Sequence, residues 1–519
     1  MPVDAISLEV FRNLFASVAE EMGVTLQRAS FSPNIRERLD FSCAVFDKNA
    51  RMVAQAAHIP VHLGSMPASV EFAIRSFEQL NQGDLIVLND PYRGGTHLPD
   101  ITMVSPVFDA DGIAFYVASR AHHADVGGMS PGSLPLSTEL YQEGLIIPPV
   151  LLRLSGWIND GVFQMIVANT RNPQERTGDI EAQMAAHRVG EQRMRDLLVD
   201  HSPPIVHEHA QALMAYSQKL TEDIIAHIPD GTYTFSDALE GDGQSEFDIP
   251  IQATVTVDGS AMTVDFSGSA SQVLGNVNAV EAIVRSATWY CVRLLADDDI
   301  PVNHGCFAPV TVTTPVGSVV NPYFPAAVSV GNTETSQRVV DVVLGALALA
   351  LPDRIPAASQ GSMNNVTIGG WYKGRQFVYY ETIGGGHGGG PASDGLSGRQ
   401  SHMTNTMNTP VESLEMAYPL RVWRYGLRKD SGGAGRHPGG EGVIREYEFL
   451  SEATVTLNTE RRVKAPYGLA DGESGKVGIN TLVRNGRKEK LSGKHTTRVQ
   501  PGDRLIIETP GGGGWGKSG

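Results

Sequence analysis

Two runs of alternating apolar residues, joined by a tight turn, constrain the fold of this chain most strongly. The runs cover residues 101–108 and 113–121, and the turn between them reads Asp109-Ala-Asp-Gly112. Alternation of this kind is typical of β-strands, and a D-x-D-G turn between two such runs favours a β-hairpin. We therefore expect two adjacent antiparallel strands whose open end lies near residues 100 and 122.

The open end of this hairpin gathers ionisable side chains. With the tight loop at residues 110–111, Asp100 pairs with Ala121, one residue before His122. Facing Cβ atoms lie ~5 Å apart and diagonal ones ~7–8 Å apart. His97, Asp100 and His122 should therefore converge, and a register shift of one residue would still leave them clustered.

Two imidazoles and one carboxylate are a common ligand set for a catalytic divalent metal such as manganese, zinc or iron. The alternative is a set of polar residues that only satisfies a glycine-rich loop. Because strand side chains alternate between faces, we expect only one of His122 and His123 to bind metal. The other would face the substrate or a hydrogen-bond partner.

Weaker candidates lie upstream. Asp40 could complete the metal shell or could form an ion pair with Arg36 or Arg38. His58 and His62, in an apolar loop, are interpreted as hydrogen-bonded structural histidines.

Glycine runs need a separate interpretation. Gly511-Gly-Gly-Gly-Trp-Gly-Lys-Ser518 matches the P-loop pattern, but a P-loop needs a helix directly after it. We therefore expect a flexible tail that does not bind ATP. The run Gly384-Gly-Gly-His-Gly-Gly-Gly390 could allow a backbone to approach a ligand closely, or could be a loop at an interface.

Length and composition indicate an α/β (mixed α+β), multi-domain fold with several β-rich regions and long connecting helices. A chain of 519 residues suggests roughly two to four domains, and 56 Gly and 30 Pro indicate many turns. We expect an N-terminal metal-bearing α/β domain at 1–230, a central α/β domain with Gly-rich loops at 231–440, and a β-rich segment with the tail at 441–519.

Charge and hydropathy exclude several partners. A net charge of −16 argues against nucleic acid. The longest uncharged apolar run, residues 342–351, is roughly half of a membrane span, and no export signal is visible. Three cysteines far apart in sequence fit a reducing compartment. We therefore expect a cytoplasmic protein without membrane contact.

Many short motifs, in this order, resemble the hydantoinase B/oxoprolinase family, which includes ATP-dependent hydantoinase B subunits and relatives in the large subunits of acetone and acetophenone carboxylases. The motifs that carry the resemblance are Glu37-Arg-Leu-Asp-Phe-Ser-Cys43, Ile59-Pro-Val-His-Leu-Gly-Ser-Met66, Asn89-Asp-Pro-Tyr92, Gly94-Gly-Thr-His-Leu-Pro-Asp-Ile101, Arg120-Ala-His-His-Ala-Asp-Val-Gly-Gly128, Gln142-Glu-Gly-Leu-Ile-Ile-Pro-Pro149, Asp265-Phe-Ser-Gly268, Tyr380-Glu-Thr-Ile-Gly-Gly385, Asn408-Thr-Pro-Val-Glu412 and Asp430-Ser-Gly-Gly-Ala-Gly435.

The resemblance implies a hetero-oligomer in which a hydantoinase A-like ATPase subunit uses ATP to phosphorylate the carbonyl oxygen of a small cyclic amide. A subunit like this one would then open the ring at a divalent metal. The family pattern assigns the metal to His97, Asp100 and His122, with Asp40 as a less certain ligand, and we expect His123 to accept the proton of water.

Two other functions stay open. The family also includes ketone carboxylases, whose large subunits tend to be longer than this chain, so we rank carboxylation second. The chain could also be a non-catalytic assembly subunit, which would keep complex activity after loss of His97 and His122.

Overall fold

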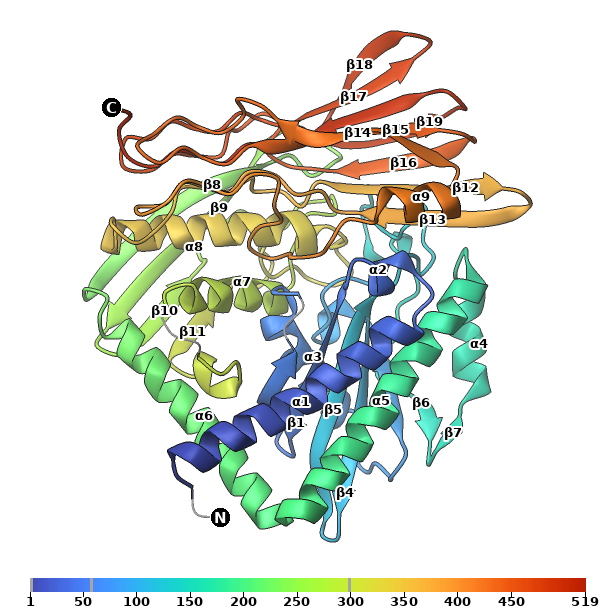
Figure 1. Cartoon of the computed structure of the whole chain (residues 1–519), viewed down its shortest axis with the longest axis vertical. Coiled ribbons are helices and arrows are strands. Elements are labelled where there is room, and N and C mark those ends of the chain that lie inside the picture. Colours follow the sequence, from blue (N-terminus) through green and yellow to red (C-terminus); the bar gives the residue numbers. More distant parts are fainter. Residues whose placement is uncertain (1–2, 57–58, 297–299) are drawn as a thin grey trace.

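The computed structural model describes residues 3–56, 59–296 and 300–519 (Figure 1). Within these residues the chain forms four β-sheets with helices packed between and against them. The expected mixed α/β, multi-domain fold is confirmed.

The N-terminal sheet positions the candidate site. Its strands are antiparallel and lie in the order β2-β1-β5-β4-β3-β6-β7. Their bounds are β1 (Phe41–Asp47), β2 (Met52–Ala56), β3 (Leu85–Leu88), β4 (Asp100–Asp109), β5 (Gly112–His122), β6 (Val150–Leu154) and β7 (Trp157–Ile158).

Helices cover both faces of this sheet. Cys43 and Val45 of β1 pack in the cluster that contains α1 and α5, whereas Ala44 and Phe46 pack in the cluster that contains α3. Alternate side chains therefore serve two cores, which explains why the whole strand is buried. Figure 1 shows α1 and α5 side by side across the sheet.

The helices of this region are α1 (Ala5–Ala29), α2 (Pro33–Arg36), α3 (His62–Arg75), α4 (Asp160–Ala168), α5 (Pro173–His201) and α6 (Pro203–Ile225), with 3-10 turns η1 (Pro91–Arg93) and η2 (Leu140–Gln142).

The predicted hairpin is β4–β5, and its register changes once. Next to the loop, Phe108 faces Ile113, as expected. An irregularity between Val107 and Phe108 then shifts the pairing by one residue, so that Asp100 faces His122 directly. Such a bulge adds one residue to one strand and leaves no clear signature in an alternating apolar pattern.

The second sheet has the order β11-β10-β9-β8, with β10 and β11 parallel, and α8 packs against β8 and β9. Its elements are β8 (Gly231–Glu240), β9 (Asp248–Asp258), β10 (Ala261–Asp265), α7 (Glu281–Arg293), η3 (His304–Phe307), β11 (Val310–Thr313), the π-helical turn η4 (Gly331–Thr335) and α8 (Ser336–Ala350).

Two further sheets enclose a third core, the orange and red layer of Figure 1. One has the order β13-β12-β16-β19 and the other β14-β15-β20-β17-β18. Their elements are β12 (Asn365–Tyr372), β13 (Arg375–Glu381), α9 (Val411–Ala417), β14 (Leu420–Arg428), β15 (Gly442–Phe449), β16 (Ala453–Asn458), β17 (Ile479–Arg484), β18 (Arg487–Leu491), β19 (Lys494–Val499) and β20 (Arg504–Glu508).

The pairing of strands in these two sheets crosses the domain boundary expected at residue 440. Strands β12 and β14 precede that residue, yet they pair with β16 and β15, which follow it. We propose that the last structural unit begins near residue 360, and that the division near 230, between α6 and β8, stands.

The expected flexible tail is instead part of a glycine-rich layer. Residues 510–516 are buried, and the amide of every residue from 511 to 516 donates to a backbone carbonyl. A Cβ atom on Gly512 would lie 1.9 Å from the carbonyl oxygen of His387, in the run 384–390. Both glycine runs therefore serve close backbone packing, and these amides are not available to cradle a phosphate.

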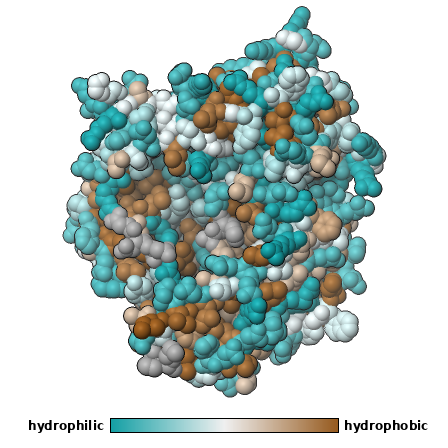
Figure 2. Space-filling view, in the orientation of Figure 1, coloured by the Kyte–Doolittle hydropathy of each residue, from teal (hydrophilic) through white to brown (hydrophobic). Residues whose placement is uncertain are grey.

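Hydrophilic side chains dominate the face in Figure 2, with hydrophobic groups gathered mainly at its left and lower edges. None of the helices in the described part of the chain combines the length and the apolar character that crossing a bilayer requires.

Candidate metal centre

The three predicted ligands meet at the open end of the hairpin. One potential ligand atom from each of His97, Asp100 and His122 lies within 4.8 Å of the other two. The Nε2 atom of His97 is 3.3 Å from Oδ2 of Asp100, and the two imidazole rings meet edge to face with centroids 5.0 Å apart. All three side chains are buried. The convergence expected from the sequence is therefore observed.

The loop before β4 is held in place by Asn89. Its amide nitrogen donates to the carbonyls of Leu98 and Leu145, at 2.8 and 2.9 Å, and its side-chain oxygen accepts from the amide of Ile147 at 2.7 Å. Buried amides that satisfy both donors and acceptor rigidify a loop. The segment that carries His97 is thus fixed against a neighbouring loop.

The orientation of His97 follows from a backbone contact. Its Nδ1 donates to the carbonyl of Ser329 at 2.9 Å, so Nε2 faces Asp100 and lies 3.1 Å from the amide nitrogen of Asn332. Glu143 fixes the Ser329 segment, because its Oε1 accepts from the amides of Val328 and Ser329 at 2.8 and 3.0 Å. A histidine whose Nδ1–H is bound to a carbonyl presents Nε2 as a metal ligand.

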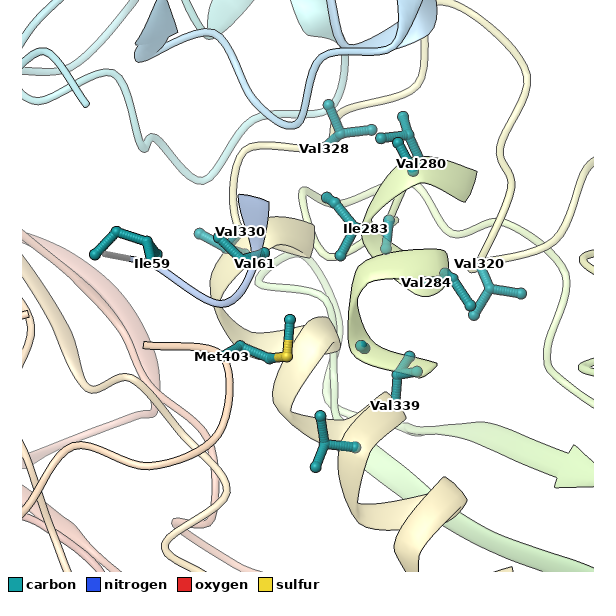
Figure 3. Close-up of a cluster of buried hydrophobic side chains, with 14 of the residues drawn as sticks. Ile59, Val61, Val280, Ile283, Val284, Val320, Val328, Val330, Val339 and Met403 are labelled. Carbon is teal, nitrogen blue, oxygen red and sulfur yellow. The ribbon is translucent and has the colours of Figure 1, made fainter. Parts of the chain in front are cut away.

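Apolar side chains surround this segment. Figure 3 shows Val61, Val330 and Met403 gathered near the start of α8, with Ile283 on α7 and Val328 near it. The amide of Val61 also donates to the carbonyl of Met403 at 3.3 Å. Three segments that are distant in sequence are thus packed together at the centre.

Two buried atoms of the cluster, without a hydrogen-bond partner in the described part of the chain, show whether a cation would fit there. Oδ1 of Asp100 and Nε2 of His122 are buried and have no hydrogen-bond partner among the described residues. Leaving such atoms unpaired costs free energy, whereas one divalent cation would satisfy both. The donor set and these two atoms therefore fit a metal site.

Electrostatics favour the protonation states that a ligand set needs at Asp100 and His122, but not at His97. Burial raises the pKa of Asp100, but the charge of His97 and hydrogen bonds from His97 and His62 outweigh it and hold that pKa well below its ordinary value. Burial lowers the pKa of His122, and the nearby His97 lowers it further. Asp100 is therefore ionised and His122 neutral at neutral pH. Burial lowers the pKa of His97, but the Asp100 carboxylate outweighs burial, so the pKa of His97 is raised overall.

The cluster opens into a small cavity of about 20 Å³. That volume holds one water or one ion. A cyclic amide needs more room, so substrate entry requires neighbouring segments to move. The lining residues are Asp40, Ile59, Val61, His62, Asp100, His122, Asn332, Thr333, Met363, Tyr380, Thr382 and Thr404.

Asp40 lines this cavity but is not one of the three converging residues. Burial raises its pKa to about 7, with the Asp100 charge acting in the same direction and Arg38 acting against both. Arg36 pairs with Glu37 at 3.0 Å, and Asp40 has no ion pair within the described ranges. The role of Asp40 as a fourth ligand stays a prediction.

His123, the expected proton acceptor, is not among the residues that line the cavity. Its Nε2 lies 2.9 Å from Oε1 of Gln183, and its Nδ1 lies 2.8 Å from the guanidinium of Arg176. Burial, and then the charge of Arg176, lowers its pKa to about 4. Both ring nitrogens of His123 are thus occupied, and its role as proton acceptor stays a prediction. The expected alternation of the two histidines is observed.

The sequence interpretation missed several residues around the cluster. His62, expected to be structural, bonds Ser42 at 2.9 Å through Nδ1, yet its Nε2 lies 3.6 Å from Oδ2 of Asp100. Tyr380 stacks on His122 with ring centroids 4.5 Å apart. Both lie in motifs of the family resemblance, which was the available signal. Asn332 lies outside those motifs, and His58 lies outside the described residues.

The family model described as hydantoinase B/oxoprolinase matches residues 4–518. The chain belongs to the hydantoinase B/oxoprolinase family. An uncharacterised protein of Methanocaldococcus jannaschii is 42% identical, over 99% of this chain and 91% of its own length. The 5-oxoprolinase 1 of Arabidopsis thaliana is 41% identical over 99% of this chain but only 42% of its own length. A protein named as the B component of a D-/L-hydantoinase, from a Pseudomonas species, is 33% identical over 99% of this chain and 90% of its own length.

Solved structures agree with this assignment. The ATP-dependent caprolactamase from Pseudomonas jessenii has a TM-score of 0.93 and 29% identity, covering 100% of this chain and 92% of that chain. An acetone carboxylase has a TM-score of 0.90 and 16% identity over 98% and 76% of the two chains, which shows a shared fold alone. The names of the relatives confirm the expected enzyme class of this family, hydrolysis of carbon–nitrogen bonds in cyclic amides.

Proposed function

We propose that this chain is the metal-bearing subunit of a cytoplasmic, ATP-dependent cyclic-amide hydrolase. The observation that carries the proposal is the buried cluster of His97, Asp100 and His122, with two polar atoms that lack a partner and share one cavity. Relatives named for 5-oxoproline and hydantoin chemistry support the substrate class.

In this proposal His97, Asp100 and His122 hold a manganese, zinc or iron ion, and Asp40 adds a carboxylate from the residue that precedes β1. A divalent cation at such a site would lower the pKa of water to about 7 and so would supply hydroxide at neutral pH. The chain's own residues fix this arrangement: Ser329 holds the His97 ring, and Tyr380 stacks on His122.

The proposal also includes a partner. A hydantoinase A-like ATPase subunit would phosphorylate the carbonyl oxygen of the ring, which turns a poor electrophile into an activated one. The Pseudomonas relative, named as the B component of a hydantoinase, supports a complex of different chains, and the ATP-dependent caprolactamase supports the use of ATP. Because the amides of residues 511–516 bond other backbone groups, we assign ATP to the partner.

The test combines the purified chain with its partner ATPase, ATP, a panel of cyclic amides, simple ketones and labelled bicarbonate. We expect a ring-opened product without label, and loss of at least 100-fold of the rate in His97→Ala and in His122→Ala. Incorporation of label into a ketone would instead support the carboxylase function. Unchanged ring opening in the double variant would support a non-catalytic assembly role.

A further inference from the structure

A buried guanidinium lies beside the candidate metal centre, with no carboxylate of the described residues within ion-pair distance. Arg38 is fully buried, and no ion pair to it is found in the part of the chain that the structure describes. It donates only to neutral groups: Asn34 Oδ1, the Tyr380 carbonyl, Thr382 Oγ1, Thr406 Oγ1 and the Met407 carbonyl. A buried charge without a counter-ion favours an anion nearby.

The hydrogen bonds around Arg38 determine which of the neighbouring threonine hydroxyls donates to which. Thr382 Oγ1 accepts from Arg38 at 2.8 Å and from Gln400 at 3.2 Å, so both acceptor sites are used. Its O–H must then donate to Thr406 Oγ1, 2.8 Å away. Thr406 Oγ1 also accepts from Arg38 at 3.4 Å, so its own O–H donates to Thr404 Oγ1 at 3.2 Å.

Thr404 ends this chain of hydroxyls. Its Oγ1 accepts from the hydroxyl of Thr406 and, at 3.4 Å, from the amide of Thr406. Its own hydrogen has no acceptor among the residues of known placement. Thr404 also lines the cavity that Asp100 and His122 line. A hydroxyl with an unused hydrogen, linked to a guanidinium through two further hydroxyls, therefore belongs to a residue that lines the cavity.

We propose that Thr404 binds an oxygen of the phosphoryl group carried by the activated substrate, and that Arg38, Thr382 and Thr406 are positioning residues for it. This inference rests on the proposed function, because that function brings a phosphorylated ring to the metal centre. Charge supports it: the relay starts from a guanidinium that forms no ion pair with the described residues, and hydrogen bonds to charged oxygens are stronger than neutral ones. Inorganic phosphate, released in the same reaction, carries the same oxygens and binds the same donor once the neighbouring segments have moved, as substrate entry also requires.

The experiment compares Thr404→Val, which keeps the shape and removes the hydroxyl, with Thr404→Ser, which keeps it. Both are assayed in the metal-loaded complex with the partner, for ring opening and for binding of inorganic phosphate by calorimetry. We expect Thr404→Val to weaken phosphate binding and to lower kcat/KM roughly 10–100-fold, the size of a lost hydrogen bond to a charged group. Thr404→Ser should stay within about 3-fold of the wild type.

Two further variants separate local from general effects. Thr406→Val interrupts the relay while keeping the Thr404 hydroxyl, and should show a loss smaller than that of Thr404→Val. Thr288→Val is the matched control, because its buried hydroxyl donates to the carbonyl of Val284 within α7, and it should behave as the wild type. Metal content should be unchanged in all variants.

The outcomes are distinguishable. If Thr404→Val and Thr404→Ser bind phosphate equally and turn over equally, the inference is overturned while the proposed function stands. If the wild type opens no ring, the proposed function fails. The phosphate affinities of Thr404→Val and Thr404→Ser then still show whether the Thr404 hydroxyl binds phosphate. If Thr404→Val loses its fold, the phosphate affinity and kcat/KM of Thr406→Val decide, and wild-type values there would overturn the relay.

Discussion

At the scale of single residues, the candidate centre depends on histidines that use one ring nitrogen for a hydrogen bond to the surrounding protein and turn the other towards Asp100. Ser329 holds His97, and Ser42 holds His62. The sequence predicted the convergence of His97, Asp100 and His122, because the hairpin keeps them clustered even when its register shifts by one residue. It could not predict Asn332, because contacts between residues 232 positions apart follow from tertiary packing.

Glu143 gives a prediction at this scale. Burial raises its pKa to about 7, against an ordinary value near 4.5, although Ser137 and two backbone amides donate to it. Between these two values the folded protein holds a proton that the unfolded chain has lost, so stability falls as pH rises through this window. Glu143→Gln keeps an acceptor oxygen and removes this titration.

We therefore expect the free energy of unfolding of Glu143→Gln, relative to the wild type, to increase between pH 5 and pH 8 by roughly 2 kcal/mol. Urea unfolding at both pH values measures the difference. A constant difference across this range would show that Glu143 titrates at its ordinary pKa.

At the scale of elements, the hairpin and the glycine runs show what a sequence pattern can and cannot give. The alternating apolar residues and the turn between them predicted the β4–β5 hairpin and the residue pairs next to its loop. The bulge between Val107 and Phe108 was not predicted, and it places His122 directly opposite Asp100. The run 511–516 matched a flexible tail by composition, but glycine without a side chain also permits close backbone packing.

The glycine-rich layer gives a prediction of its own. In Gly512→Ala the new Cβ would lie 1.9 Å from the carbonyl oxygen of His387, so the backbone must shift. We expect a loss of at least about 3 kcal/mol in the free energy of unfolding, as for overpacked buried sites. The matched control is Gly426→Ala in β14, where a Cβ meets nothing within 4 Å, and urea unfolding of both variants tests the difference. Equal stability would contradict the close packing.

At the scale of the whole molecule, the cavity lies where three parts of the chain meet. Its lining includes His122 from the N-terminal sheet, Asn332 from the turn before α8, and Thr404 from the segment after the first glycine run. The family match over residues 4–518 is consistent with a site that needs the whole chain. The sequence predicted several domains, but the strands on both sides of residue 440 share sheets, because strand pairing there is non-local.

We propose, above all, that His97, Asp100 and His122 bind a divalent cation. Elemental analysis of the purified chain after extensive dialysis tests it directly, with His97→Ala, His122→Ala and the exposed control His227→Ala beside the wild type. We expect about one manganese, zinc or iron per chain in the wild type and the control, and a loss of at least ten-fold in the two cluster variants. A wild type without metal, or cluster variants that keep it, would contradict the account.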